Sequence, residues 1–249
     1  MRTGLRGSAR SAARKKVDAA GGIGRLKHDR LPTPIDDQPI IRMNRDTLYS
    51  SGVFDLTTPG VPVAAGSISL LPYGGGVQSV AVRNGMLGCA VSATVKTDPG
   101  FAVFFDTSGN FIASVTVGAL PDMITFTPDG SKAITANEGE PSLNYAVDPE
   151  GSISVIDVSG KTITQSDVTT LGFNGLATGV IDPSIVPFGP GSPTIGQDLE
   201  PEYVAVSPDS SFAWVTIQEH SAHAVVDLSV PAITAVRPFG TKKHGSGTA

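Results

Sequence analysis

Two stretches of the chain share one pattern of apolar and polar positions. Residues 120–142, LPDMITFTPDGSKAITANEGEPS, alternate apolar and polar residues, turn tightly, alternate again and end in an acidic loop. Residues 199–221, LEPEYVAVSPDSSFAWVTIQEHS, repeat this order. Alternation of period two is typical of β-strands with one buried face, and Pro-Asp-Gly and Pro-Asp-Ser are turn sequences. Each stretch therefore predicts a β-hairpin.

The hairpins belong to longer repeating units. A fainter third copy lies at 77–93, with Arg83-Asn84-Gly85 as its turn, and two further strand-like runs follow each copy. A unit of about forty residues with four antiparallel strands is typical of a β-propeller blade. The sequence therefore predicts an all-β fold, a partial β-propeller of about three four-stranded antiparallel blades. The blade-like units span about 77–118, 121–168 and 201–239. A two-sheet sandwich is the alternative.

The domain boundaries follow from the spacing of the repeats. The propeller is expected over 66–245, with a Gly- and Pro-rich insertion at 169–197 and a tail at 246–249. Three blades are fewer than the roughly four to eight that close a propeller, which suggests a truncated or fused reading frame. Open ends of the propeller would favour self-association.

Charge is distributed unevenly. Residues 1–45 hold eleven Lys/Arg against four Asp, or +7, whereas residues 46–240 hold five against nineteen Asp/Glu, or −14. We expect residues 1–30 to be a basic, poorly ordered arm, and residues 31–65 a fragment with one or two strands. The acidic body argues against nucleic acid and favours cations as partners. The sequence contains no apolar stretch typical of a transmembrane segment or a signal peptide.

The acidic residues concentrate in particular loops. In a four-stranded meander, the loop that enters the first strand and the loop between the second and third strands emerge at the same end. Carboxylates, carbonyls and water are the ligands that Ca²⁺ prefers. The sequence therefore predicts a divalent-cation site, with Ca²⁺ as the possible cofactor, and the alternative is solvated loops. The expected metal ligands are Glu138, Glu140, Asp148, Asp198, Glu200 and Glu202.

Other residues give weaker evidence for a functional site. Cys89 lies in a strand-like run and is expected to be buried, and Trp214 alternates with apolar neighbours and is expected in the core. His220 and His223 are expected to be independent surface or interface histidines rather than a metal pair. The Asp and Asn of the tight turns are explained by turn geometry. No catalytic residue can be assigned, which favours a non-enzymatic role.

Long ordered strings carry a family resemblance. They include GVQSVAVRNG at 76–85, residues 104–141 from FFDTSGN to NEGEP, VDPEGSISVIDVS at 147–159 and QDLEPEYVAVSPDSSFAWVTIQE at 197–219. These strings resemble the bacterial choice-of-anchor I domain, a propeller-type family related to mesenchyme-specific cell-surface glycoproteins. A shorter segment, 32–63, resembles a fragment of a bacterial jelly-roll-type family of unknown function, through IRMNRDTLYS above all.

The main resemblance implies a function class. It implies a secreted or cell-envelope protein that acts as a non-enzymatic binding or scaffold module, with a divalent cation or a surface partner as ligand. A calcium-dependent phosphoesterase propeller, similar to phosphatases and phytases, is one alternative. A non-functional fusion fragment is another.

Overall fold

The computed structural model describes residues 40–43, 50–55, 61, 63–160 and 162–240. The chain divides into two units, Met1–Asp36 and Asp37–Ala249, and all structural statements below concern the second unit. The basic arm predicted at 1–30 and the tail at 246–249 lie outside the described residues. No helix among the described residues is long and apolar enough to cross a membrane.

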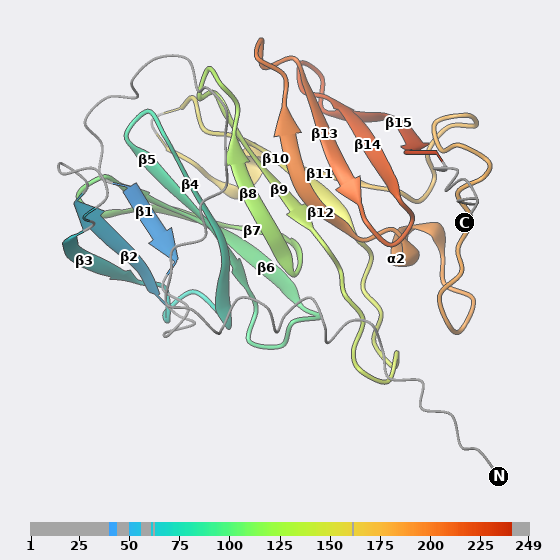
Figure 1. Ribbon diagram of the computed structural model, residues 1–249, viewed down its shortest axis with the longest axis horizontal. Coiled ribbons are helices and arrows are strands. Elements are labelled where there is room, and N and C mark those ends of the chain that lie inside the picture. Colours follow the sequence, from blue (N-terminus) through green and yellow to red (C-terminus); the bar gives the residue numbers. More distant parts are fainter. Residues whose placement is uncertain (1–39, 44–49, 56–60, 62, 161, 241–249) are drawn as a thin grey trace, which may run out of the picture. The chain divides into compact units, whose positions relative to one another are not determined.

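Twelve strands form three antiparallel four-stranded sheets, which we call the first, second and third blade (Figure 1). The first blade contains β4 (Gly76–Arg83), β5 (Met86–Ser92), β6 (Pro99–Asp106) and β7 (Phe111–Ala119). The second contains β8 (Pro121–Phe126), β9 (Lys132–Asn137), β10 (Ser152–Asp157) and β11 (Val168–Gly172). The third contains β12 (Pro201–Val206), β13 (Phe212–Ile217), β14 (Ala222–Asp227) and β15 (Ala232–Pro238). The predicted all-β architecture of three four-stranded blades is confirmed.

The last strand of the second blade differs from the prediction. The sequence placed the end of this blade at 168 and an insertion at 169–197, but β11 runs from Val168 to Gly172. A short 3-10 helix, η1 (Gln165–Asp167), precedes it, and the Thr164 backbone N–H donates to Asp167 Oδ2 at 2.7 Å. Such local side-chain bonds compete with strand formation. The long connection therefore begins at 173, and it ends with the short helix α2 (Ile195–Asp198).

A further sheet precedes the first blade. It consists of β1 (Ile40–Met43), β2 (Ser50–Asp55) and β3 (Val63–Ser69), all antiparallel, and β1 and β2 lie beside β4. The sequence expected one or two strands over 31–65. The third strand, β3, crosses the expected boundary at 65/66, and its start, VAAG, lacks the alternation that would have revealed it.

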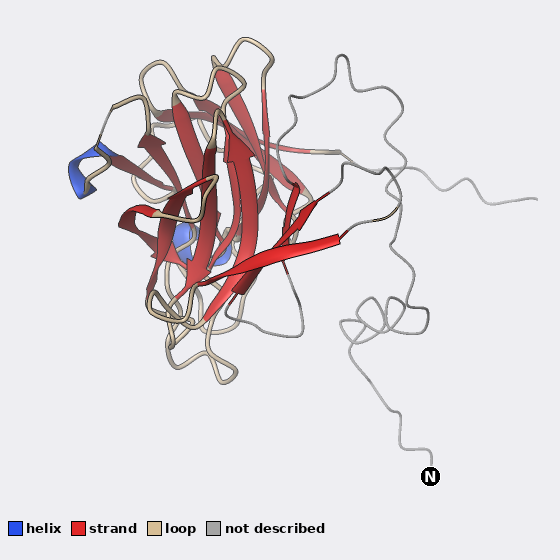
Figure 2. Ribbon diagram, turned by 90° about the vertical axis from the view of Figure 1, so that its left-hand side faces the viewer, coloured by secondary structure: helices blue, strands red, loops and turns tan. Residues whose placement is uncertain are grey.

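The core lies between the faces of neighbouring blades. Ala102 and Phe104 of the first blade pack with Ile124 of the second. Ile134 and Ile153, on the other face of the second blade, pack against the third blade in a separate cluster. Strand β8 lies beside both β4 and β12, so neighbouring blades meet along their first strands (Figure 1). Figure 2 shows the strands, with the loops at their ends.

Two residues expected in the core differ in burial. Cys89 is fully buried, as predicted. Trp214 is 41% exposed, so the expectation that it lies in the core was wrong. Val215 beside it packs towards the second blade, so Trp214 lies on the other face of β13, which no described blade covers.

Two glycines allow the blades to approach closely. A Cβ on Gly100, at the start of β6, would collide with the Pro121 ring and lie 2.7 Å from the Val91 carbonyl oxygen. A Cβ on Gly151, before β10, would collide with the Leu199 carbonyl oxygen. In both cases the third strand of one blade begins against the segment that starts the next blade. Glycine at this position therefore sets the spacing between blades.

Candidate functional site

The aspartates of the tight turns have structural partners. Thr127 Oγ1 donates to Asp129 at 2.6 Å and the Ser131 backbone N–H donates at 2.9 Å. These hydrogen bonds lower the pKa of Asp129 to about 2, with the Thr127 hydroxyl as the largest cause. Asp209 of the third blade has the same environment, with Ser207 and Ser211 as donors and a pKa lowered to about 2. Turn geometry explains both residues, as the sequence predicted.

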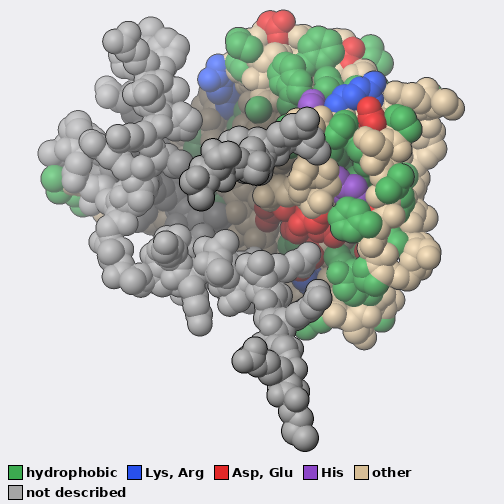
Figure 3. All heavy atoms as spheres, turned by 45° about the vertical axis from the view of Figure 1, so that its right-hand side comes forward, with side chains coloured by type: hydrophobic (Ala, Val, Ile, Leu, Met, Phe, Trp, Pro, Cys, Tyr) green, Lys and Arg blue, Asp and Glu red, His purple; other side chains and the backbone are tan. Residues whose placement is uncertain are grey.

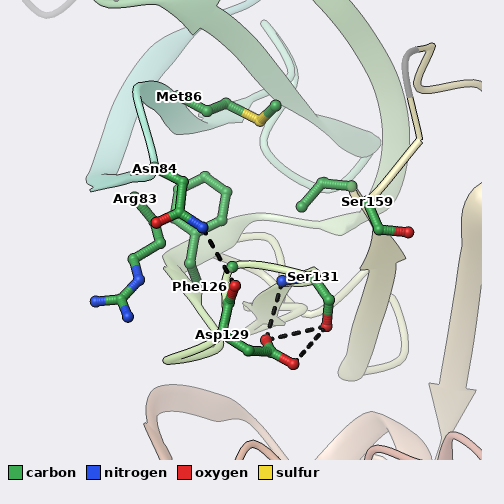
Figure 4. A pocket seen from close by; sticks show the side chains of 9 residues that line it. Arg83, Asn84, Met86, Phe126, Asp129, Ser131 and Ser159 are labelled. Atoms are coloured by element: carbon green, nitrogen blue, oxygen red, sulfur yellow. Dashed lines mark hydrogen bonds between the residues drawn. The ribbon is translucent and has the colours of Figure 1, made fainter.

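A cavity of about 340 Å³ lies between the turns of the first and second blades (Figure 4). Asn84 reaches across it, and its Nδ2 donates to the Asp129 carbonyl oxygen at 3.2 Å. The Asp129 backbone N–H in turn donates to Ser210 Oγ at 3.1 Å. These bonds tie the turns of all three blades together, so the polar groups at this end serve the fold.

A different arrangement occurs where the long loops emerge. Glu138 follows β9 directly, and burial raises its pKa to about 8. Nearby carboxylates raise this pKa further, in the order Asp122, Glu140, Glu202 and Glu200. The second and third blades therefore bring acidic side chains together at one end. We call Asp122, Glu138, Glu140, Glu200, Glu202 and Glu219 the acidic cluster.

Glu202 and Glu140 have different environments within the acidic cluster. Burial raises the pKa of Glu202 to about 7, and the carboxylates of Glu219 and Asp122 contribute to the shift. Glu140 has a counter-charge, because Lys96 Nζ lies 2.8 Å from its Oε2 and both side chains are about one-third exposed. Figure 3 shows acidic side chains gathered on one part of the surface, with apolar side chains beside them. Near neutral pH, Glu138 and Glu202 thus retain protons that ordinary glutamates would release.

Asp198 has a different environment from the cluster. Its carboxylate accepts hydrogen bonds from the backbone N–H groups of Phe188 and Gly189, at 2.8 and 2.9 Å. Its Oδ2 lies 3.0 Å from Nε2 of His220, whose side chain is almost fully buried, and the Phe188 ring packs on that imidazole at 4.5 Å. The His220 contact lacks hydrogen-bond geometry. Asp198 therefore anchors the long connection to the third blade. His220 is buried, although the sequence predicted a surface or interface residue.

The six predicted metal ligands thus separate into two groups. Glu138, Glu140, Glu200 and Glu202 belong to the acidic cluster. Burial raises the pKa of Asp148, and the nearby carboxylate of Asp198 raises it further. No three of the described His, Cys, Asp and Glu side chains lie in positions that could hold one metal ion. The calcium site stays a prediction. Asp122 and Glu219 join the cluster without having been chosen as ligands, although Pro121-Asp122 and Pro201-Glu202 occupy equivalent positions.

Replacing Asp198 with Ala should release the long connection without unfolding the blades. The substitution leaves two backbone N–H groups without their acceptor, which costs about 1–3 kcal/mol. We expect faster amide hydrogen exchange over 186–197 and unchanged exchange in β4–β6 and at 180–182, which pairs separately with Val236 of β15. Asp182→Ala is the matched control, because among the described residues the Asp182 carboxylate accepts hydrogen bonds only from nearby Ser184. Equal protection of 186–197 in the wild type and in Asp198→Ala would contradict the anchoring role.

Three four-stranded antiparallel blades packed face to face define a partial β-propeller. The model of the choice-of-anchor I domain matches residues 38–249, so the chain belongs to the choice-of-anchor I domain family. The match begins at 38 and so includes most of the segment 32–63, which the sequence related to a jelly-roll-type family. No curated protein matches the chain.

One solved structure supports the fold. The chain is similar to KlHsv2 with loop 6CD replaced by a Gly-Ser linker, at 15% identity and a TM-score of 0.52, over 90% of this chain and 59% of that one. It is also similar to hydrazine synthase of Kuenenia stuttgartiensis, at 16% identity and a TM-score of 0.49, over 86% of this chain and 52% of that one. The chain thus spans between half and three-fifths of these structures.

Proposed function

We propose that this domain is a non-enzymatic binding module whose acidic cluster takes up a divalent cation, with Ca²⁺ as the ligand. The observation that carries the proposal is the raised pKa of Glu138, about 8, and of Glu202, about 7, in side chains contributed by adjacent blades. Two carboxylates at ~4 Å repel by about 1 kcal/mol even in water, and by more near protein. A bound cation would replace this repulsion with attraction.

The chemistry of Ca²⁺ suits such a cluster. Calcium accepts six to eight oxygen ligands, and backbone carbonyls and water count among them. The side chains of Glu138 and Glu202 would move towards the ion and supply negative charge. Water molecules would then complete the coordination shell of the ion. Because the cluster is partly exposed, we expect an affinity of about 10⁻⁴–10⁻³ M, the range of extracellular modules.

Binding is better supported than catalysis. The hydroxyls of Ser207 and Ser131 are engaged by the turn aspartates, and His220 is packed under Phe188. These groups therefore serve the fold. A secreted or cell-surface location, which the family resemblance implied, accords with calcium at extracellular concentration and forms part of this proposal.

Calcium should raise the melting temperature. At 10 mM calcium, about ten to a hundred times the expected dissociation constant, binding should stabilise the fold by about 1.4–2.7 kcal/mol, which corresponds to roughly 3–11 °C for a chain of this size. The double variant Glu138→Gln with Glu202→Gln should lose this response. Asp98→Asn, an exposed acid in a first-blade loop, should retain it. Identical melting temperatures in 10 mM calcium and in chelator would refute the cation proposal.

The phosphoesterase alternative can be tested in the same samples. A binding module should not hydrolyse a phosphate monoester, with or without calcium. Turnover that depends on calcium and disappears in the double glutamine variant would replace the binding proposal with an enzymatic one. Turnover that the double variant retains would point to a contaminating activity and leave the binding proposal standing.

A further inference from the structure

The cavity between the turns of the first and second blades is a site that the proposed function leaves unused. Its volume of about 340 Å³ lies within the range of small-molecule pockets. Strand β8 carries Asp122 of the acidic cluster near its start and ends at this cavity with Phe126, so the two sites lie at opposite ends of the strand. Figure 4 shows Arg83 and Asn84 on one side of the cavity and Ser159 on the other.

The floor of the cavity is apolar and belongs to the core. Phe126 and Val158 are only 8% and 6% exposed, and both pack in the core cluster that the first and second blades share. Met86 of the first blade is half-buried and packs against the same cluster. Because the core holds these side chains in place, the floor exists before any ligand binds, and it suits an apolar group.

Two serines give the cavity a side that accepts hydrogen bonds. Ser131 Oγ donates its proton to the Asp129 carboxylate at 3.0 Å, and Ser159 Oγ donates to Asp157 Oδ1 at 2.6 Å. A hydroxyl has one proton, so each serine oxygen keeps only lone pairs for a ligand. The carboxylates of Asp129 and Asp157 add negative charge beside these oxygens. This side of the cavity therefore favours a positively charged donor.

Arg83 supplies the opposite charge. It is the only Lys or Arg among the described residues that line the cavity, and its guanidinium forms no ion pair or hydrogen bond with another described residue. When the repeats are aligned on their turns, Thr127 and Ser207 occupy the equivalent position, and the hydroxyl of each donates to the aspartate of its own turn. The turn of the first blade, Arg83-Asn84-Gly85, has no aspartate. The turn itself therefore does not require the arginine side chain, which is available to a ligand.

Gly130 allows Arg83 to lie beside the turn of the second blade. A Cβ on Gly130 would collide with the Asn84 amide and lie 3.3 Å from Arg83 Cγ, so the arginine side chain packs close to this glycine. The third blade carries Ser210 at the equivalent position. Glycine at position 130 thus leaves room for the turn of the first blade to approach. This approach brings Arg83 to the same cavity as Ser131.

We propose that this cavity binds an apolar α-amino acid as a zwitterion. The guanidinium of Arg83 pairs with the carboxylate of the ligand, which its planar fork matches. The ammonium group of the ligand donates to the oxygens of Ser131 and Ser159, and its apolar side chain packs on Met86 and Phe126. The acidic cluster takes no part, so the inference goes beyond the proposed function and is independent of it.

The charges around the cavity distinguish this ligand from other small molecules. A phosphate monoester carries close to two negative charges, which one arginine does not balance and which Asp129 and Asp157 repel. A simple carboxylate has no donor for Ser131 and Ser159, and a simple amine leaves Arg83 without a partner. The carboxylate, the ammonium group and the apolar side chain of the ligand therefore all contribute to binding.

Two-dimensional NMR of the whole chain, titrated with L-leucine as the probe, locates the site. A few polar contacts of modest net strength give roughly millimolar affinity, so the titration extends to about 10 mM L-leucine. We expect the backbone amide signals of Arg83, Gly130, Ser131 and Ser159 to shift with increasing L-leucine. The amide of Glu138, in the acidic cluster, should not shift.

Three related probes test the parts of the ligand. Compared with L-leucine, 4-methylpentanoate lacks the ammonium group and 3-methylbutylamine lacks the carboxylate. Each should bind at least about tenfold more weakly, because one charge-assisted contact is lost. Glycine lacks the apolar side chain and should also bind at least about tenfold more weakly.

Arg83→Gln should weaken the binding of L-leucine about tenfold, because the carboxylate of the ligand loses its charged partner. Lys132→Gln is the matched control, since it removes a positive charge near the same turn from a side chain that does not line the cavity, and it should bind L-leucine like the wild type. Should Arg83→Gln fail to fold by circular dichroism, Arg83→Lys tests the same contact. It should also bind more weakly, because lysine keeps the charge without the planar fork.

Unchanged amide signals at the highest L-leucine concentration would overturn the proposal. Shifts confined to residues away from the cavity would place the ligand elsewhere and would also overturn it. Equal affinity for L-leucine and 4-methylpentanoate would contradict the role of the ammonium group, and unchanged affinity in Arg83→Gln would contradict the role of the arginine. None of these outcomes bears on the calcium proposal, because the probes contain no metal and the acidic cluster lies at the other end of β8.

Discussion

Replacing Gly151 with Ala is expected to destabilise the domain by about 3 kcal/mol, the upper end of the range for overpacked sites. The added Cβ would collide with the Leu199 carbonyl oxygen and lie 2.7 Å from Pro201 Cδ and 3.1 Å from the Glu138 carbonyl oxygen. Backbone and a proline ring surround the position, so no flexible side chain can move aside. The segment that enters the third blade would have to shift.

Urea denaturation measures this effect as a lower midpoint. Gly172→Ala is the matched control, because a Cβ on that β11 glycine would meet nothing within 4 Å. We expect the control to change stability by less than about 1 kcal/mol. Equal midpoints for Gly151→Ala and the wild type would show that the second and third blades do not approach each other as closely as described.

Stability should fall as pH rises from about 5 to about 8. The pKa of Glu138 is raised from 4.5 to about 8, so in this interval the folded protein binds a proton that the unfolded chain has released. Unfolding therefore becomes more favourable with increasing pH, by at most about 1.4 kcal/mol per pH unit from Glu138, and Glu202 adds a contribution of the same sign up to about pH 7. The actual slope should be smaller, because Glu138 is only partly buried and water screens its neighbours.

Thermal unfolding at a series of pH values tests this prediction, without calcium and with chelator present. Glu138→Gln should reduce the decline, because glutamine carries no charge at any pH, and the part due to Glu202 should remain. Asp98→Asn should leave the decline unchanged. The turn aspartates Asp129 and Asp209 affect the stability of the fold in a lower pH range. The pKa values of Asp129 and Asp209 are lowered to about 2, so the stability they contribute is lost only as pH falls from about 4 towards 2. A melting temperature that rises between pH 5 and 8 would contradict the account of Glu138.

The repeats made the architecture predictable. Apolar alternation and the turn sequences revealed eleven of the twelve blade strands, because each of these strands has one buried face or a recognisable turn. The exception is β11, where Thr164 and Asp167 form a helical turn that alternation cannot reveal. Alternation also showed that Trp214 lies on one face of its sheet. It could not show whether another blade covers that face, and none of the described blades does.

The sequence predicted where in the fold the candidate site lies, but it predicted less well which residues belong to the site. Antiparallel topology alone places Glu138 and Glu202 at the same end, which the electrostatic coupling between them bears out. Topology cannot tell which acids have other partners. Asp198 is held by the backbone N–H of Phe188, ten residues earlier in an irregular segment, and Glu140 by Lys96 of the first blade, so neither contact follows from the strand topology.

Isothermal titration with calcium at pH 7, in two buffers of different ionisation enthalpy, tests the proposed function most directly. Metal binding requires deprotonated ligands, so uptake of Ca²⁺ should release roughly one to one and a half protons, given pKa values of about 8 for Glu138 and about 7 for Glu202. Glu138→Gln should weaken binding and release fewer protons, whereas Asp98→Asn should match the wild type. Absence of binding heat at millimolar calcium in both buffers, or binding that Glu138→Gln leaves unchanged, would contradict the account.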